Sequence, residues 1–278
     1  MTAKIPALLR AHGLYPRKGL GQNFLISQAA LDDMVAAADL SAEDVVVEVG
    51  AGLGTLTRLL AREAGRVVAV ELDSDLVEIL RHELADLPNV EIIHGDILQI
   101  SDLGFSHGGY KVVGNLPYYI TSAVLRRFLE KAPRPVIMVV TVQREVAERI
   151  VAGPGEMSLL AISVQFYGQP SIVARIKAGS FYPPPQVDSA VVRIDVGQHP
   201  TVLLGEGTDD QAFFRVVRAG FGQKRKMLRN ALSAGLGMTP LQVENALGKA
   251  GIDPRRRAET LSLDEWVEVT REIYLAAS

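Results

Sequence analysis

The chain has 278 residues, of which 48% are hydrophobic and 22% charged, and its formal net charge is −3, which together indicate a globular protein of roughly two domains. It has no cysteine, which excludes disulfide frameworks, thiolate metal sites, iron–sulfur clusters and a cysteine nucleophile, and with five scattered histidines we expect no metal site of any kind. No run of about 18 apolar residues and no signal-peptide core is present, so we expect no membrane association and a cytoplasmic location.

In the first two thirds of the chain, short β-branched runs alternate with helical patterns. Strands are expected at 44–50, 66–73, 90–94, 110–115 and 135–142, and helices at 55–64, 74–87, 121–131 and 143–151. Further strand-like runs, with no obvious helices between them, cover 158–166, 171–176 and 187–196. Strands that are apolar on both faces and alternate with helices indicate a parallel sheet covered on both sides, and the later runs indicate an antiparallel edge. The pattern therefore predicts a doubly wound, mostly parallel, Rossmann-like α/β fold.

The pattern changes after Val196. Residues 197–207 are loop-like, and amphipathic helices are expected at 211–221, 224–234, 240–250 and 263–276. We therefore expect an α/β domain over residues 1–200 and a small C-terminal helical domain over residues 201–278.

The first expected strand runs into a glycine turn that contains Gly50 and Gly52. Such glycines let the backbone approach a ligand at the start of the next helix. The spacing is G-x-G-x-G rather than the G-x-G-x-x-G typical of dinucleotide binders. Glu71 lies in the second expected strand, where a ribose diol would need an acceptor, and Asp96 follows the third, where it could bind an adenine amino group. A glycine turn alone is often only a tight connection, but with both acids it predicts a nucleoside-binding site.

The tetrapeptide Asn115-Leu116-Pro117-Tyr118 follows the fourth expected strand. Proline after a strand is often only a stop signal and tyrosine only packing, but beside a nucleoside pocket these residues suit chemistry on adenine. The exocyclic nitrogen of adenine is a poor nucleophile because its lone pair is delocalised into the ring. The amide oxygen of Asn115 and the backbone oxygen of Leu116 could accept its two hydrogens, while Pro117 would set the turn and Tyr118 would stack on the flipped base. Direct methyl transfer from a sulfonium depends on alignment and needs no general base.

These motifs together resemble those of the S-adenosylmethionine-dependent ribosomal RNA adenine dimethyltransferases. Two further stretches, KGLGQNFL at 18–25 and FYPPPQVDS at 181–189, resemble two more motifs of that family. The resemblance spans nearly the whole chain. It implies S-adenosyl-L-methionine as cofactor, contacts from Asn23 and Leu25 to the methionine portion of that cofactor, and packing of Phe181 against the target base.

Leu116 and the 181–189 loop resemble the small-subunit group of that family, because the sister group that methylates large-subunit RNA more usually has isoleucine after the asparagine. The resemblance therefore implies dimethylation at N6 of two adjacent adenines in a small-subunit rRNA hairpin, on a pre-assembled small subunit and by a monomer, with a role in subunit maturation. The alternatives are a large-subunit enzyme of the macrolide-resistance type, a DNA adenine methyltransferase and a largely non-catalytic ribosome-assembly factor. A nicotinamide oxidoreductase is disfavoured by the glycine spacing.

Basic residues are unevenly distributed. The segment from Arg215 to Arg229 holds six basic residues and no acidic one in an otherwise acidic protein. This pattern is compatible with a polyanion bound at selected edges, and an ordinary solvated helix face is the alternative. We predict that the helical domain orients RNA while the α/β domain holds the cofactor and performs the chemistry. The predicted phosphate-binding residues are Lys224, Arg225, Lys226 and Arg229.

Overall fold

A computed structural model describes residues 4–101, 103–104, 109–197, 200–202, 204, 208–223 and 225–277. The chain packs as two compact units, one formed by Met1–Glu148 and Gln169–Gln198, the other by Arg149–Gly168 and His199–Ser278.

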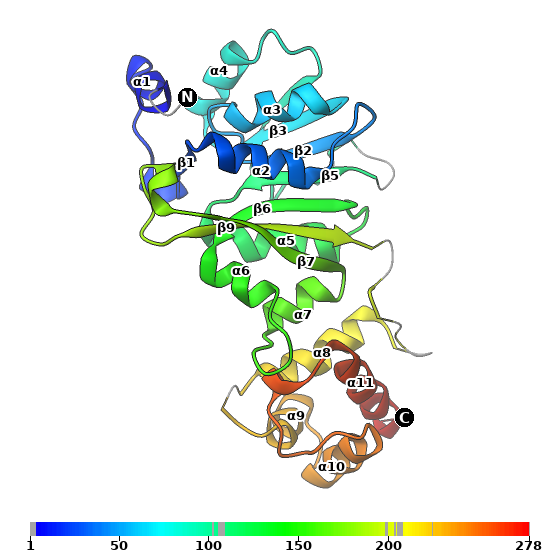
Figure 1. Cartoon of the computed structure of the whole chain (residues 1–278). Helices are drawn as coiled ribbons and strands as arrows, with labels where there is room; N and C mark the ends of the chain where they lie inside the picture. Colours follow the sequence, from blue (N-terminus) through cyan, green and yellow to red (C-terminus); the bar gives the residue numbers. More distant parts are fainter. Residues whose placement is uncertain are drawn as a thin grey trace. The chain divides into compact units, whose positions relative to one another are not determined.

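The first unit is built on a seven-stranded sheet with the order β4-β3-β2-β5-β6-β9-β7 (Figure 1). The strands are β2 (Val45–Val49), β3 (Arg66–Glu71), β4 (Val90–His94), β5 (Lys111–Asn115), β6 (Ile137–Gln143), β7 (Gly168–Ile176) and β9 (Ser189–Val196). Neighbouring strands from β4 to β6 pair in parallel, and β9 pairs antiparallel with β6. The predicted doubly wound α/β fold with an antiparallel edge is confirmed.

Helices cover both faces of this sheet because the central strands carry apolar side chains on both sides. The helices of the first unit are α1 (Lys4–Ala11), α2 (Gln28–Ala38), α3 (Thr55–Glu63), α4 (Ser74–Glu83) and α5 (Thr121–Glu130), and α6 (Arg144–Ile150) continues into the second. Figure 1 shows α2 and α3 in front of the sheet and α5 behind it. Met34 and Leu60 pack from α2 and α3 onto a cluster that includes Val46, Val113 and Val139, and all five side chains are fully buried.

A second, two-stranded sheet joins segments that are far apart in the sequence. It consists of β1 (Phe24–Leu25) and β8 (Phe181–Tyr182), which pair antiparallel. Neither strand was predicted, because a strand of two residues has no measurable periodicity. The pairing holds the segment before α2 against the loop that leads into β9.

The run 158–166 was predicted to be a strand, and this prediction is wrong. It forms α7 (Leu159–Gln165), because the hydroxyl of Ser158 accepts a hydrogen bond from the backbone N–H of Ala161 and so caps a helix. A short continuous apolar run fits a buried strand and a buried helix equally well. The ring of Phe166 stacks on the ring of Phe213 within the second unit, and the two ring centroids are 4.6 Å apart.

The second unit contains α7 and the helices α8 (Asp210–Phe221), α9 (Leu228–Leu236), α10 (Pro240–Lys249) and α11 (Leu263–Ala277). The helix predicted from residue 224 begins four residues later, at Leu228, because Met227 has an extended backbone. The predicted division at residue 200 also differs from the packing in one place, since Arg149–Gly168 belongs to the helical unit. The functional division that we attached to the two domains stays a prediction.

Candidate active site

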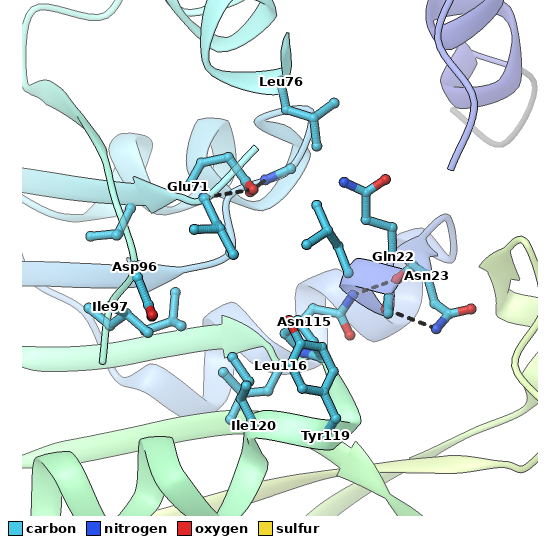
Figure 2. Close-up of a pocket in the computed structure, with 18 of the residues that line it drawn as sticks. Gln22, Asn23, Glu71, Leu76, Asp96, Ile97, Asn115, Leu116, Tyr119 and Ile120 are labelled. Atoms are coloured by element: carbon cyan, nitrogen blue, oxygen red, sulfur yellow. Dashed lines mark hydrogen bonds between the residues drawn. The ribbon is translucent and has the colours of Figure 1, made fainter. Parts of the chain in front are cut away.

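A cavity of about 270 Å³ lies at the carboxyl ends of β2, β3, β4 and β5, in the first unit. Ligands of open α/β sheets bind at this edge, next to the strand from which the chain continues in both directions across the sheet. Here that strand is β2, with β3 on one side and β5 on the other. The segment 20–24, which precedes α2, adds a further wall. Figure 2 shows Asp96 and Ile97 on one side of the view, Gln22 and Asn23 on the other, and Asn115 between them.

The glycine turn brings backbone close to the cavity. Gly52 has a positive φ of 61°, and a Cβ atom there would lie 3.3 Å from two ring carbons of Phe24. The positive φ favours glycine, and a larger residue would in addition press on the ring of Phe24. Gly50 and Gly52 both line the cavity, as the sequence predicts for a ligand-approaching turn.

Glu71 lies at the end of β3 with only 7% of its surface exposed. One carboxylate oxygen accepts from the N–H of Gly52 at 2.8 Å, and the other accepts from the N–H groups of Leu72 and Asp73, both at 2.9 Å. Figure 2 shows Glu71 at the cavity wall. These bonds hold the carboxylate at the cavity wall in one orientation. Burial raises the pKa of Glu71 above its usual range, although the three N–H donors oppose that rise.

Asp96 follows β4 and lines the cavity beside two apolar residues, Ile97 and Leu98. Its carboxylate accepts from the Leu98 N–H and from the side chain of Gln99, both at 2.9 Å. A carboxylate beside an apolar wall is the arrangement that binds the polar edge and the flat face of a planar base. The structure therefore brings Gly50, Gly52, Glu71 and Asp96 together around one cavity.

Asn115 ends β5, and its orientation is defined by a hydrogen bond. Its amide nitrogen donates to the backbone oxygen of Asn23 at 2.8 Å (Figure 2). With the donor side engaged in this way, the amide oxygen of Asn115 is the atom left to accept hydrogen bonds from a ligand. The side chain of Asn23 is itself directed to the backbone oxygen of Gly21, at 3.1 Å.

The three residues after Asn115 also line the cavity. Leu116 is buried with 2% exposed, and Pro117 leads into the short 3₁₀ helix η2 (Tyr118–Ile120). The hydroxyl of Tyr118 is 2.6 Å from the hydroxyl of Ser189, and partial burial raises the pKa of this phenol. Tyr118 is therefore held in place at both its backbone and its hydroxyl.

Leu25 and Phe181 do not line this cavity. They are direct partners in the β1–β8 pair, and their exposed fractions are 5% and 2%. Both side chains belong to the hydrophobic cluster between the sheet and α2. Phe181 thus packs inside the protein, where the motif resemblance had placed it against a base. The neighbour of Leu25 that reaches the cavity is Phe24.

Sequence reasoning missed a polar network that holds the 17–24 segment at the cavity. Arg17 donates to Asp73 at 2.8 Å and to Asp75 at 2.6 Å. The side chain of Gln22 donates to the other oxygen of Asp73 at 2.8 Å and accepts from the backbone N–H of Arg17 at 2.8 Å. Asp73 is also the N-cap of α4, and its own N–H binds Glu71. An Asp two residues after a strand-end Glu was the available signal, because such a residue caps the following helix.

Glu48 is a second carboxyl group that sequence reasoning missed. It lies on β2 with 1% exposed and lines a small cavity together with Gly50, Gly52 and Asn115. Burial and the neighbouring carboxylate of Glu71 raise the pKa of Glu48 to about 8. The surroundings of Glu48 therefore favour its protonated, neutral form.

In the second unit, the predicted phosphate-binding residues differ in their surroundings. Arg225 and Lys226 are exposed in the turn between α8 and α9, whereas Arg229 forms an ion pair with Glu244 of α10. Lys224 lies outside the described residues. A groove of about 390 Å³ between α8 and α9 is lined by Arg215 and Arg218 among small residues. The basic segment thus offers several exposed charges, but the charge of Arg229 is already compensated.

Within the described part of the chain, no helix is long and apolar enough to cross a membrane. The same residues contain no cluster of three histidine, aspartate or glutamate side chains that could hold a metal ion.

Comparison with known proteins gives the relatives of the chain. Residues 14–274 match the family described as ribosomal RNA adenine dimethylase. Ribosomal RNA small subunit methyltransferase A of Dehalococcoides mccartyi (strain CBDB1) is 50% identical over 98% of this chain and 93% of its own length. The protein of the same name from Pelotomaculum thermopropionicum is 44% identical, over 96% and 94%.

Two solved structures share the fold over most of the chain. The 23S rRNA methyltransferase ErmE has a TM-score of 0.72 at 26% identity and covers 91% of this chain and 100% of its own. A dimethyladenosine transferase from Plasmodium falciparum has a TM-score of 0.74 at 24% identity, over 91% and 98%. At that identity the second similarity supports the fold alone.

Proposed function

Since the chain belongs to the ribosomal RNA adenine dimethylase family, we propose that it dimethylates N6 of two adjacent adenines in a hairpin of small-subunit ribosomal RNA. The proposal of the small subunit is supported by curated relatives of that name at 44–50% identity, compared with 26% for the large-subunit enzyme ErmE. The chain is an S-adenosylmethionine-dependent methyltransferase. We further propose that it acts as a monomer, in the cytoplasm, on a pre-assembled small subunit during maturation.

The observation that carries this proposal is the orientation of Asn115. Its amide nitrogen is engaged by the backbone oxygen of Asn23, so its amide oxygen is the acceptor that an incoming amine meets. An acceptor at the end of β5, beside Leu116 and the ring of Tyr118, suits the exocyclic amine of a flipped adenine. Hydrogen bonds to both N–H groups of that amine localise its lone pair on nitrogen and make it a better nucleophile.

The residues at the other strand ends suit the cofactor. Glu71, held by three backbone N–H groups, keeps free lone pairs for a ribose diol, and Asp96 lies where an adenine amino group would be bound. Gly50 and Gly52 have no side chains, so the protein backbone at this turn can approach the ligand closely. The segment with Asn23 closes the cavity on the opposite side. S-adenosylmethionine supplies an electrophilic methyl group when bound. The contribution of this chain is then alignment and exclusion of water, which is enough for direct displacement.

The helical unit would orient the RNA. Arg225 and Lys226 are exposed cations outside the α/β unit, and contacts from such residues to phosphates position a nucleic acid without reading its sequence. We include Lys224 in this role from the sequence alone. Arg229 contributes less to the proposal, because its guanidinium is paired with Glu244.

The test is mass spectrometry of ribosomal RNA from a bacterial strain that lacks its own small-subunit dimethyltransferase. Supplying this protein should restore dimethyladenosine in small-subunit RNA. The matched variant Asn115→Ala should fold equally well yet turn over about 100- to 1000-fold more slowly, since loss of one aligned group at the reacting atom has effects of that size.

Three outcomes would overturn the proposal. Dimethyladenosine in large-subunit RNA would favour the alternative enzyme class, and equal methylation of DNA would favour a DNA methyltransferase. A correctly folded protein that rescues subunit assembly without methylating any RNA would favour the assembly-factor alternative.

A further inference from the structure

An exposed aromatic ring stands at the mouth of the cavity. Tyr119 lines the cavity, yet 61% of its surface is exposed to solvent. It follows Tyr118 directly in the 3₁₀ helix η2, and it lies on the same side of the cavity as Asn115 (Figure 2). A partner that covers an exposed aromatic ring of this size removes apolar surface from water, and this makes the free energy of binding more favourable.

The ring is held against the backbone on one side. A Cβ atom built on Gly21 would lie 3.2 Å from both Cδ1 and Cε1 of Tyr119, so this ring packs closely against the glycine. Gly21 has a positive φ of 61° and follows the short 3₁₀ helix η1 (Lys18–Leu20). Tyr119 is therefore a supported ring with its remaining surface directed to solvent.

Tyr118 and Tyr119 present separate surfaces. Successive side chains on a 3₁₀ helix diverge by about 120° because it has three residues per turn. The hydroxyl of Tyr118 is bound to Ser189, and its ring lines the cavity interior. The two rings thus cannot lie on the same face of one base, and Tyr119 is left for a different partner.

We propose that Tyr119 stacks on the nucleobase that adjoins the target adenine in the RNA strand and so positions that strand at the mouth of the site. This inference rests on the proposed function, because it takes a polynucleotide as the substrate. When one base enters the cavity, its neighbour in the strand is drawn to the rim and loses a stacking partner. Exposed aromatic side chains bind unstacked bases in this way, with little regard to sequence.

The test compares four variants on small ribosomal subunits isolated from a strain that lacks the dimethylation. Tyr119→Leu keeps apolar bulk but removes the aromatic face, and Tyr119→Ala removes both. Both should weaken binding to these subunits by about 5- to 100-fold, the usual loss for one stacked base. Tyr119→Phe should recover most of the affinity. Tyr15→Leu is the matched control, because Tyr15 is 78% exposed but does not line the cavity.

Calorimetry with S-adenosylmethionine separates this role from a role in holding the cofactor. If Tyr119→Leu weakens cofactor binding as much as subunit binding, the ring serves as a strap over the cofactor and the inference is wrong. If the Tyr119→Leu variant binds the subunits as tightly as the wild-type protein does, stacking is not involved and the inference is wrong. Binding is measured without turnover, so a lack of methylation by the wild-type protein would reject the proposed function and not this inference.

A second arm identifies the base. In subunits reconstituted on transcribed rRNA, the nucleotide on either side of the target is replaced by uridine, which stacks weakly. The wild-type protein should lose affinity for one of these two subunits, and Tyr119→Ala should lose clearly less for the same one. Equal losses for both proteins on both subunits would overturn the inference.

Discussion

At the scale of single residues, two carboxyl groups near the glycine turn, Glu71 and Glu48, have different surroundings. Glu71 accepts three backbone N–H groups and faces the cavity, whereas Glu48 lies under the glycine turn with 1% exposed. Burial raises the pKa of both, and that of Glu48 to about 8. The Glu71 carboxylate is thus oriented toward a ligand, whereas the surroundings of Glu48 favour its protonated form.

Glu71 should determine cofactor affinity. Glu71→Ala removes the acceptor for the ribose hydroxyls, and loss of such a charge-assisted bond should weaken S-adenosylmethionine binding about 10- to 100-fold in calorimetry. Glu78→Ala, at an exposed position of α4, is the matched control. Melting temperatures must accompany the titrations, because Glu71 also binds the turn before α4. Unchanged affinity in a folded variant would place the ribose elsewhere.

Glu48 should make the stability of the protein depend on pH. Because its pKa is raised, the native state holds a proton that the unfolded chain releases above its ordinary pKa near 4.5. The unfolding free energy contributed by this group therefore falls as pH rises from about 4.5 to about 8. Glu48→Gln removes this dependence, so the variant should gain several kcal/mol over the wild type at pH 8 but little at pH 5, by the usual ~1.4 kcal/mol per pKa unit.

Urea unfolding at the two pH values measures this difference. Glu43→Gln, at an exposed position in the loop before β2, controls for the loss of one carboxyl group elsewhere. A stability difference between Glu48→Gln and the wild type that is the same at pH 5 and pH 8 would mean that Glu48 is charged in the native protein.

At the scale of elements, the sequence predicted the buried parallel strands more accurately than the apolar run at 158–166. The strand at Val90–His94 has the predicted limits, and no limit of β3, β5 or β6 differs from the predicted one by more than two residues. Strands that are buried on both faces read as continuous β-branched runs, which is a strong local signal. The same signal misled at 158–166, where a serine cap decides for a helix.

The parts of the site that lie on strand ends could be predicted for the same reason. Gly50, Glu71, Asp96 and Asn115 each lie at the end of a recognisable strand or just after it, and the carboxyl ends of parallel strands share one edge of the sheet. The positions of Leu25 and Phe181 could not be predicted, because they depend on a pairing between two-residue strands that are far apart in the sequence. Tyr119 was missed because its exposure depends on how η2 lies against Gly21.

Close helix packing in the second unit gives a prediction at this scale. In α8, a Cβ atom on Gly220 would lie 2.3 Å from the ring of Trp266 in α11, which is fully buried. Gly220→Ala should therefore destabilise this unit by about 1–3 kcal/mol through overpacking. Gly248→Ala in α10 has open space and should stabilise its helix by up to about 1 kcal/mol.

Fluorescence of Trp266, the single tryptophan of the chain, reports this unfolding directly. If both glycine variants shift the urea midpoint in the same direction, the contact between Gly220 and Trp266 is not the limiting one.

At the scale of the whole molecule, we propose that one unit performs the chemistry and that the exposed cations of the other contact the polyanion. Neutralising Arg225 and Lys226 should weaken binding to rRNA and reduce the slope of log affinity against log salt by up to about 0.9 per lost phosphate contact. Binding of S-adenosylmethionine should stay unchanged, because its proposed residues lie in the other unit.

The matched control for this experiment is Arg229→Gln. Because Arg229 is already paired with Glu244, its loss should change the slope of log affinity against log salt less. Affinities are measured at several salt concentrations for both variants and the wild type. An unchanged slope after loss of Arg225 and Lys226 would make the segment an ordinary hydrated surface, and the RNA path would then be sought among the basic residues near Arg17 and Lys18.

The pairing of β1 with β8 has a consequence for the order in which the protein becomes active during its own synthesis. Phe24 contributes to the cavity wall, and its backbone partner is Tyr182, more than half the chain later. Strands β2 to β5 can be made and paired while this wall still lacks its support. A nascent chain that has emerged only as far as β6 therefore carries the glycine turn and both strand-end acids but an open site. Closure of the cavity wall by Phe24 is then coupled to synthesis of the chain beyond Tyr182, so a product truncated before β8 would lack the backbone support of this wall.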